Sequence, residues 1–166
     1  RLSMLDSLTG ILNKKSCENA ISQYLNTNTP VHCALLFLDL DDFKKINDTI
    51  GHSAGDRLLE ETGKLLHKTF HASDIIGRVG GDEFMVLLTN YQGSKESLKK
   101  RCTTLQRTLQ QIMQNHGVQA TCSIGALLVK GQSISFQTAY TLADKYLYEA
   151  KSSGKNNCIV QNLNKE

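Results

Sequence analysis

The chain has 166 residues, of which 40% are hydrophobic and 6% aromatic, and its formal net charge is +3. This length suits a single domain with a real hydrophobic core, and the composition argues against disorder. No apolar run approaches the roughly 18 residues that a membrane-spanning helix requires. A mild charge without a concentrated basic stripe argues against a nucleic-acid binder.

The five cysteines are widely and irregularly spaced, and no two of them form a C-x-x-C pair. An odd number of cysteines without a framework fits a reducing compartment better than a secreted scaffold. We also expect no signal peptide, because no basic stretch followed by an apolar stretch opens the chain. We therefore expect a cytoplasmic domain without membrane contact of its own, although the full-length protein could be membrane-anchored.

The first part of the chain shows one helical pattern and one strand pattern. We interpret residues 1–5 as the end of an upstream linker, residues 6–162 as the domain and residues 163–166 as a tail. Apolar residues recur at helical spacing over residues 12–26. A turn at Asn28-Thr29-Pro30 follows, and the continuous apolar run 33–38 predicts a central strand covered on both faces.

The middle of the chain predicts two helices and a hairpin. The helices cover residues 42–48 and 53–67, with Gly51 between them. Two apolar runs, 75–79 and 84–88, flank a pair of glycines at positions 80 and 81. Two glycines between strand-like runs predict a hairpin, since such turns use positive φ angles.

The last part of the chain alternates helices and strands. We expect helices over residues 94–115 and 137–151, and strands over residues 120–129 and 157–161. No internal repeat and no domain boundary interrupts this order. An α/β fold, with a central mixed β-sheet flanked by helices, is the natural closure.

Acidic residues gather at two places beside predicted strands. Asp39, Asp41 and Asp42 follow the buried run, and Asp82-Glu83 follow the glycine pair. If these segments pair, Asp39 and Asp82 converge, and two facing carboxylates suit Mg²⁺, which leaves positions open for substrate phosphates. Such a metal lowers the pKa of an attacking hydroxyl and neutralises charge on a transferring phosphoryl group. Solvated turn residues are the alternative that spacing alone leaves open.

Asn47 and Asp56 form a second candidate group between the two acidic clusters. Their amide and carboxylate are a chemically sensible pair for the edge of a guanine, because the carboxylate accepts from N1–H and the exocyclic amine. Helix capping is the alternative, since Asn and Asp are favoured at caps and Gly51 is a natural helix stop.

At these residues the chain resembles the GGDEF domain, the catalytic domain of bacterial diguanylate cyclases. Gly80-Gly81-Asp82-Glu83-Phe84 spells the signature of that family. Other segments resemble its further motifs, in the family's order and across nearly the whole chain: residues 6–10, 38–48, 51–56, 123–125 and 143–151. The resemblance implies a sheet related to the palm of polymerases and of class III nucleotidyl cyclases.

The resemblance also implies a reaction, in which two GTP molecules condense into cyclic di-GMP and release pyrophosphate. Each domain binds one GTP, and each ribose 3′-hydroxyl attacks the α-phosphate of the partner's GTP across a homodimer. A single site holds only one reactant, so the partner must orient the second. An upstream sensory or regulatory domain can control such a dimer, and we expect no nucleic-acid partner.

Particular residues receive roles from the same resemblance. Mg²⁺, or Mn²⁺ in its place, is held by Asp39, Asp82, Glu83 and the backbone carbonyl of Leu40, and Asp82 is the proton acceptor for the 3′-hydroxyl. Asp82 and Glu83 are thus the catalytic pair. The remaining residues bind substrate: Asn47 and Asp56 read guanine, Phe43 and His52 line the nucleotide site, and Lys44, Lys151 and Lys155 hold the triphosphate.

The chain departs from the family pattern at two positions. Many members carry an inhibitory product site, R-x-x-D, before the signature, and here the window reads His71-Ala72-Ser73-Asp74. A histidine lacks the bidentate guanidinium fork, so we expect product inhibition through Asp74 to be weak, and His71 itself also fits an exposed residue at a helix end. Lys155 stands where an arginine is frequent, which lowers the expected affinity for triphosphate.

Three functions remain to be distinguished: an active diguanylate cyclase, a silent module that binds GTP as a regulator, and a cyclase that makes mixed dinucleotides. The intact acidic motif and Lys44 favour the first. Asp56 argues against the third, because a carboxylate faces the acceptor N1 of adenine unfavourably.

Overall fold

The computed structural model describes residues 3–164 of the chain. Ten elements follow one another: α1 (Lys14–Thr27), β1 (Val31–Leu40), α2 (Phe43–Ile50), α3 (His52–Thr69), β2 (Ile75–Arg78), β3 (Glu83–Leu88), α4 (Lys95–Asn115), β4 (Cys122–Gln132), α5 (Phe136–Ser152) and β5 (Cys158–Asn162). Every predicted helix and strand is therefore present, with ends that differ by a few residues. None of the helices in the described part is long and apolar enough to cross a membrane.

The five strands form one mixed sheet in the order β2-β3-β1-β4-β5. β1 is antiparallel to β3 on one side and to β4 on the other, whereas β5 runs parallel to β4. The parallel pair is joined through α5, as a parallel crossover requires. The predicted central position of the run 33–38 and the mixed sheet are both confirmed.

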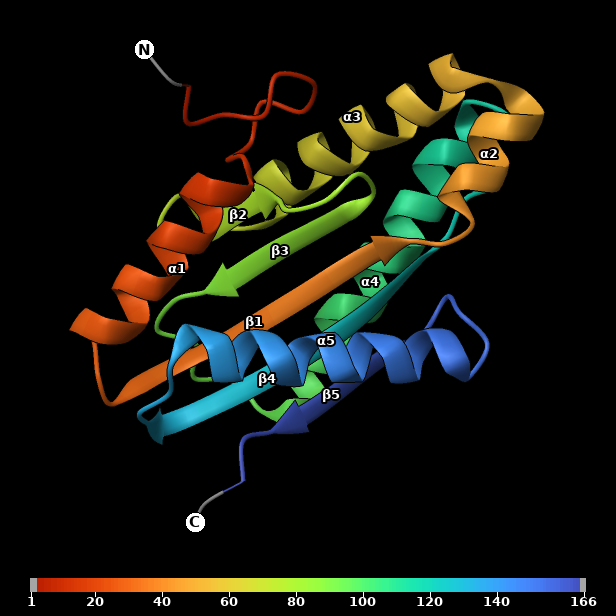
Figure 1. Cartoon of the computed structure of the whole chain (residues 1–166). Helices are drawn as coiled ribbons and strands as arrows, with labels where there is room; N and C mark the ends of the chain where they lie inside the picture. Colours follow the sequence, from red (N-terminus) through yellow and green to blue (C-terminus); the bar gives the residue numbers. More distant parts are fainter. Residues whose placement is uncertain (1–2, 165–166) are drawn as a thin grey trace.

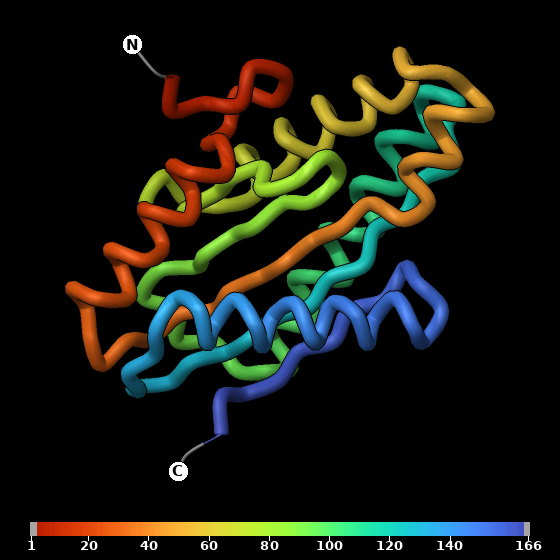
Figure 2. The backbone as a smooth tube through the Cα atoms, in the orientation of Figure 1, coloured from red at the N-terminus to blue at the C-terminus, as the bar shows by residue number. Residues whose placement is uncertain are grey.

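Helices cover both faces of this sheet. In Figure 1, α1 and α5 lie in front of the sheet and α3 and α4 lie behind it, and the tube in Figure 2 traces α5 across the front. Alternate residues of β1 serve the two faces: Leu36 and Leu38 pack in the core beneath α3 and α4, whereas Leu35 and Phe37 pack beneath α1 and α5. Because Asp39 continues the second series, β1 delivers its carboxylate to the side of α5.

Helix α5 lies in close contact with the sheet at Gly125. A Cβ atom built there would lie 2.1 Å from the backbone nitrogen of Leu147 and 2.5 Å from the carbonyl oxygen of Ala143. Only glycine allows this contact between two backbones. The close packing fixes the end of α5, including Lys151, relative to the end of β1.

The expected hairpin is present, but the expected reason for its glycines is wrong. β2 and β3 pair antiparallel from Ile75 with Leu87 to Arg78 with Phe84. Neither glycine of the turn adopts a left-handed φ. Instead, a Cβ at Gly80 would lie 2.3 Å from Oε1 of Glu83, so the glycine makes room for that side chain.

The beginning of the described chain is tied to the domain. The amide of Asn13 donates to the carbonyl of Met4 at 2.9 Å, and Leu5 forms an isolated bridge with Leu12. Residues 3–5 of the expected linker belong to this described part. Residues 1 and 2 of the linker and residues 165 and 166 of the expected tail lie outside the described residues.

All five cysteines are buried and free. Burial raises the pKa of Cys17 and of Cys33 to about 12. All five cysteines therefore act as small apolar residues of the core.

Candidate active site

The acidic clusters meet where β1 ends and β3 begins. The amide of Leu40 donates to the carbonyl of Asp82 at 3.1 Å, and Asp39 stands opposite Glu83 in the ladder between the two strands. This register brings Asp39, Asp82 and Glu83 to one end of the sheet, at the right of Figure 1, beside the start of α2 and the end of α5. The pairing on which their convergence depended is therefore present.

Asp39 is held in an environment that disfavours its charged form. Its side chain is only 15% exposed, and Oδ1 is buried without a hydrogen-bond partner. Burial raises the pKa of Asp39 to about 7, helped by the negative charges of Asp82 and Glu83 and opposed by Lys151. Burial, together with Asp82 and Asp144, also raises the pKa of Glu83. A buried acceptor without a donor, among carboxylates, suits a bound cation.

The donor set fits a magnesium ion rather than a closed metal cage. Among residues 3–164, no group of three or more His, Cys, Asp or Glu side chains is arranged as a metal site. Mg²⁺ usually takes one or two carboxylates and completes its shell with water and substrate phosphates. Asp39, Asp82, Glu83 and the carbonyl of Leu40 are therefore a suitable partial set, with the unpartnered Oδ1 of Asp39 as the observation that favours it.

One of the three predicted triphosphate ligands, Lys151, lies beside these carboxylates, and a second, Lys155, pairs with the neighbouring Asp42. Lys151, in the last turn of α5, places its Nζ 3.0 Å from Oδ2 of Asp39. Lys155 places its Nζ 2.7 Å from Oδ1 of Asp42, and this hydrogen bond lowers the pKa of Asp42. Lys44 is exposed in the first turn of α2.

The candidate base-reading residues lie on α2 and α3. Asn47 is in the last turn of α2, and its Oδ1 is buried without a hydrogen-bond partner. A Cβ at Gly55 would lie 1.8 Å from that oxygen, so the glycine opens the space that the amide occupies. Asp56 and His52 are exposed in the first turns of α3, and Phe43 is partly buried against the core.

The capping alternative for Asn47 and Asp56 is wrong. Both residues lie inside helices, and the N-cap positions of α2 and α3 are Asp42 and Gly51. No side-chain hydrogen bond caps either helix start. The side chains of Asn47 and Asp56 therefore cap neither helix.

Asp74 is engaged by its own neighbourhood. Oδ2 accepts from the amide of His71 at 3.0 Å, and Oδ1 accepts from the amide of Thr89 at 3.0 Å. His71 is exposed just beyond the end of α3, as the alternative for this residue expected. The carboxylate thus closes a turn between α3 and β2.

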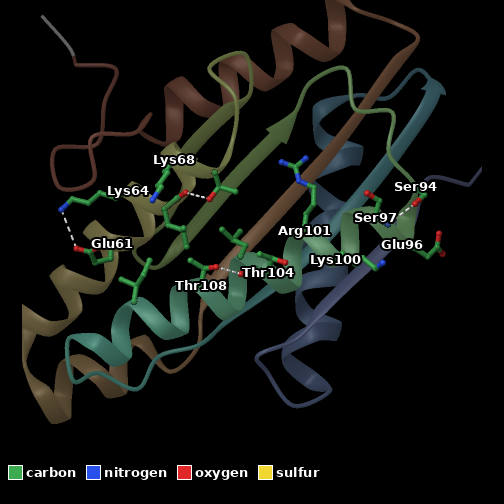
Figure 3. A pocket seen from close by; sticks show the side chains of 14 residues that line it. Glu61, Lys64, Lys68, Ser94, Glu96, Ser97, Lys100, Arg101, Thr104 and Thr108 are labelled. Carbon is green, nitrogen blue, oxygen red and sulfur yellow. Dashed lines mark hydrogen bonds and ion pairs between the residues drawn. The ribbon is translucent and has the colours of Figure 1, made fainter.

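A groove with a volume of about 870 Å³ lies elsewhere, between α3 and α4. Figure 3 shows Lys64 and Lys68 on one wall and Lys100 and Arg101 on the other. Arg101 stacks over the rings of Phe70 and Tyr91, at 5.4 and 5.9 Å from their centroids. None of the candidate active-site residues lines this groove.

Sequence reasoning missed three residues that shape the site. Arg78 donates through Nη2 to the carbonyl of Gly81 at 2.7 Å and through Nη1 to Asp6 at 3.3 Å, which ties the hairpin turn to the start of the domain. In the sequence, Gly55 stands out only as part of a motif, and Asp41 only as one of three acidic residues. Their burial and contacts, which no spacing reveals, give them their roles.

Comparison with known proteins identifies the family of the chain. The family model "Diguanylate cyclase, GGDEF domain" matches residues 3–157. The diguanylate cyclase DgcS of Shewanella oneidensis is 34% identical over 158 residues, which cover 93% of this chain and 51% of that protein. The cyclic di-GMP phosphodiesterase PdeR of Escherichia coli is 31% identical over 160 residues, 96% of this chain and 24% of that protein.

A solved structure shows the same fold. The GGDEF domain of DgcB from Caulobacter crescentus, in complex with c-di-GMP, superposes with a TM-score of 0.85 at 21% identity, covering 96% of each chain. The curated relatives are longer than this chain, which spans about half or less of their length. With its signature turn, its converging acidic residues and the family match over nearly its whole length, the chain belongs to the GGDEF family of diguanylate cyclase domains.

Proposed function

We propose that this domain is an active diguanylate cyclase that condenses two GTP molecules into cyclic di-GMP. The observation that supports this most directly is the cluster of Asp39, Asp82 and Glu83 beside Lys151. It combines carboxylates for a cation with an ammonium group for phosphate oxygens. We expect both chemistries in a site that transfers a nucleotidyl group.

Asp39, Asp82, Glu83 and the carbonyl of Leu40 would hold Mg²⁺. When bound, the ion neutralises charge on the triphosphate and lowers the pKa of the attacking hydroxyl. Asp82 takes the proton from the ribose 3′-hydroxyl of the GTP in its own site. Asn47 and Asp56 hold the guanine, with Phe43 and His52 lining the nucleotide site. Lys44, Lys151 and Lys155 hold the triphosphate.

The bonds balance in two equivalent steps. Each 3′-oxygen forms a bond to the α-phosphorus of the partner's GTP, and the bond between that phosphorus and the bridging oxygen to the β-phosphate breaks. One pyrophosphate leaves in each step, so two GTP give one cyclic di-GMP and two pyrophosphates. Because one domain holds one GTP, the reaction needs a homodimer.

Incubation with GTP and Mg²⁺, followed by mass spectrometry of the products, tests the proposal. We expect cyclic di-GMP and pyrophosphate, and we expect Asp82→Asn to abolish the product while leaving the melting temperature nearly unchanged. Asp48→Asn, at an exposed position of α2, removes the same charge and should keep full turnover. Bound GTP without any cyclic dinucleotide, even at high protein concentration, would refute catalysis.

The second candidate is a silent GTP-binding module that regulates another domain. The similarity to PdeR, a phosphodiesterase of which this chain covers only 24%, favours keeping it. The intact acidic cluster favours catalysis instead. For the longer protein we propose a cytoplasmic location and an upstream regulatory domain, which the greater length of the relatives supports.

A further inference from the structure

Asp41 is a buried carboxylate to which the proposed mechanism assigns no task. It is 3% exposed, although it directly follows β1 at the edge of the site. Within residues 3–164, the buried polar residues are Asp41, Thr62, Gln106 and Ser123. A charge is costly to bury unless it is fully paired, so its partners indicate its purpose.

Both oxygens of Asp41 are engaged. Oδ2 accepts from the hydroxyl of Thr121 at 2.8 Å and from the backbone amide of Asn156 at 2.9 Å. Oδ1 accepts from the hydroxyl of Ser123 at 2.7 Å and lies 3.7 Å from Nζ of Lys151. The carboxylate therefore joins the start of β4, the end of α5 and the loop that follows α5.

That loop has a strained backbone. Gly154, Lys155 and Asn156 have φ angles of +119°, +64° and +46°. Two consecutive non-glycine residues in the left-handed region cost energy and persist only where the surroundings hold them. Gln106 adds a second anchor, because its Nε2 donates to the carbonyls of Cys122 at 2.8 Å and Asn157 at 2.9 Å.

Three of the four buried polar residues thus gather around one loop, and that loop carries Lys155. Asp41 also contributes the second negative charge beside Lys151, whose nearer partner is Asp39 at 3.0 Å. When Asp39 serves a cation, Asp41 remains as the buried charge that keeps this ammonium group near the site.

We propose that Asp41 is a positioning residue for the triphosphate of GTP. Its carboxylate holds the strained turn at residues 154–156 in place and attracts the ammonium group of Lys151. It thereby fixes the positions of the two phosphate-binding lysines, Lys151 at the end of α5 and Lys155 in the loop that follows. This inference rests on the proposed function, because it assumes that the site binds GTP.

Asp41→Asn separates the two tasks of the carboxylate. One amide oxygen can still accept from the Asn156 amide and the Thr121 hydroxyl. The amide nitrogen then occupies the place of Oδ1, where the hydroxyl of Ser123 can accept from it. The attraction for Lys151 is lost, while the loop keeps its anchor. The variant therefore removes charge without removing shape.

The experiment compares ligands that differ in their phosphates, by calorimetry in the presence of Mg²⁺. The probes are 3′-deoxy-GTP, which lacks the attacking hydroxyl, and GMP, which lacks the leaving group, so neither turns over. We expect Asp41→Asn to weaken 3′-deoxy-GTP about tenfold or more and GMP less than twofold. Asp48→Asn, the matched control, should leave both affinities within twofold.

A purely structural role predicts an equal loss for both ligands together with a lower melting temperature, and that result would overturn the inference. Unchanged affinity for 3′-deoxy-GTP would overturn it as well. If the unaltered chain binds neither ligand, the proposed function itself fails, so the two failures are distinguishable.

Hydrogen exchange at the amide of Asn156 provides a readout that does not depend on nucleotide. We expect protection to persist in Asp41→Asn and to be lost in Asp41→Ala, and equal protection in both would contradict the clamp. If Asp41→Asn does not fold, Ser123→Ala replaces it, because it removes one partner and leaves the carboxylate in place. We expect that variant to weaken 3′-deoxy-GTP more than GMP, and the same loss for both ligands would again overturn the inference.

Discussion

Gly55 leaves room for the side chain of Asn47, a residue of the candidate site. The atom that its Cβ would strike is Oδ1 of Asn47, the end of a flexible side chain, at 1.8 Å. Gly55→Ala should therefore rotate the Asn47 amide away at little cost to stability. We expect affinity for 3′-deoxy-GTP to fall about tenfold, since one hydrogen bond to the base is lost, and the melting temperature to stay within a few degrees.

Calorimetry and thermal melts check this prediction, with Ser53→Ala as the control at an exposed position of the same helix. A large loss of stability in Gly55→Ala, with unchanged affinity in the molecules that remain folded, would show that the glycine serves packing instead.

Asp39 makes the stability of the metal-free domain depend on pH. Burial raises its pKa from the ordinary aspartate value of 3.8 to about 7 in the folded chain, so folding favours the protonated form. The contribution to the free energy of unfolding is fully present below the unfolded value and is lost as the pH rises through about 7. We expect metal-free domain in EDTA to lose stability between about pH 4 and pH 7, and Mg²⁺ to restore part of it at about pH 8.

Urea unfolding at several pH values measures this slope. Asp39→Asn should flatten it, although Glu83, whose pKa is also raised, will leave some dependence. A slope in Asp39→Asn as steep as in the unaltered chain would assign the dependence to other groups.

Asp74 and His71 bear on feedback by the product. Both oxygens of Asp74 already accept hydrogen bonds from the turn at His71 and from Thr89, and His71 offers no guanidinium fork. We expect cyclic di-GMP to inhibit the initial rate only weakly, and His71→Arg to strengthen the inhibition. Strong non-competitive inhibition that His71→Ala abolishes would prove this expectation wrong.

At the scale of elements, Arg78 connects the signature turn with the start of the domain. Its guanidinium donates to the carbonyls of Gly80 and Gly81 and to Asp6, whose Oδ2 also accepts from the amide of Thr9 at 2.9 Å. We expect Arg78→Lys to cost about 1 to 2 kcal/mol of stability and to lower turnover, because the lysine cannot bridge both partners.

A double-mutant cycle with Asp6→Asn isolates the pair. We expect a coupling free energy of about 1 kcal/mol between Arg78 and Asp6, measured by urea unfolding. Additive losses in the double variant would show that the two ends of this bridge act independently.

The elements themselves could be predicted from the sequence, because hydrophobic periodicity and turn residues determine them locally. The run 33–38 indicated a central strand, and β1 is that strand. The strand extends further, to residues 31 and 40, because it pairs with β4. That strand begins at Cys122, which pairs with Leu40 from 82 positions further along the chain. Such long-range pairing leaves no mark in a local pattern.

Only those residues of the candidate site that belong to recognisable motifs could be predicted from the sequence. Asp39 and Asp82 are recognisable, but nothing in their spacing distinguishes the buried Asp41 from the exposed Asp42 beside it. The glycine pair predicted the turn for the wrong reason, because the contact with the Glu83 side chain is a property of the folded hairpin. Burial and close approach are tertiary facts that one sequence does not record.

At the scale of the whole molecule, the proposed mechanism makes the site one half of a reaction centre. The residues assigned to it lie at one end of the sheet and on the neighbouring α2, α3 and α5 with the loop that follows α5, and in the proposed mechanism they hold one GTP. We expect specific activity to fall on dilution, and a fusion to a constitutive dimeriser to abolish that fall. Initial rates over a hundredfold range of protein concentration measure this, and equal rates for both proteins at low concentration would sink the dimer requirement.

The central place of β1 also determines when the sheet can form during synthesis. Its partner strands end at residues 88 and 132, so its apolar face leaves the ribosome long before either neighbour exists. At roughly 5 to 20 residues per second, the strand waits on the order of 5 to 20 seconds before β4 is complete. During that interval this apolar strand has only the segments made before it, α1 above all, to pack against.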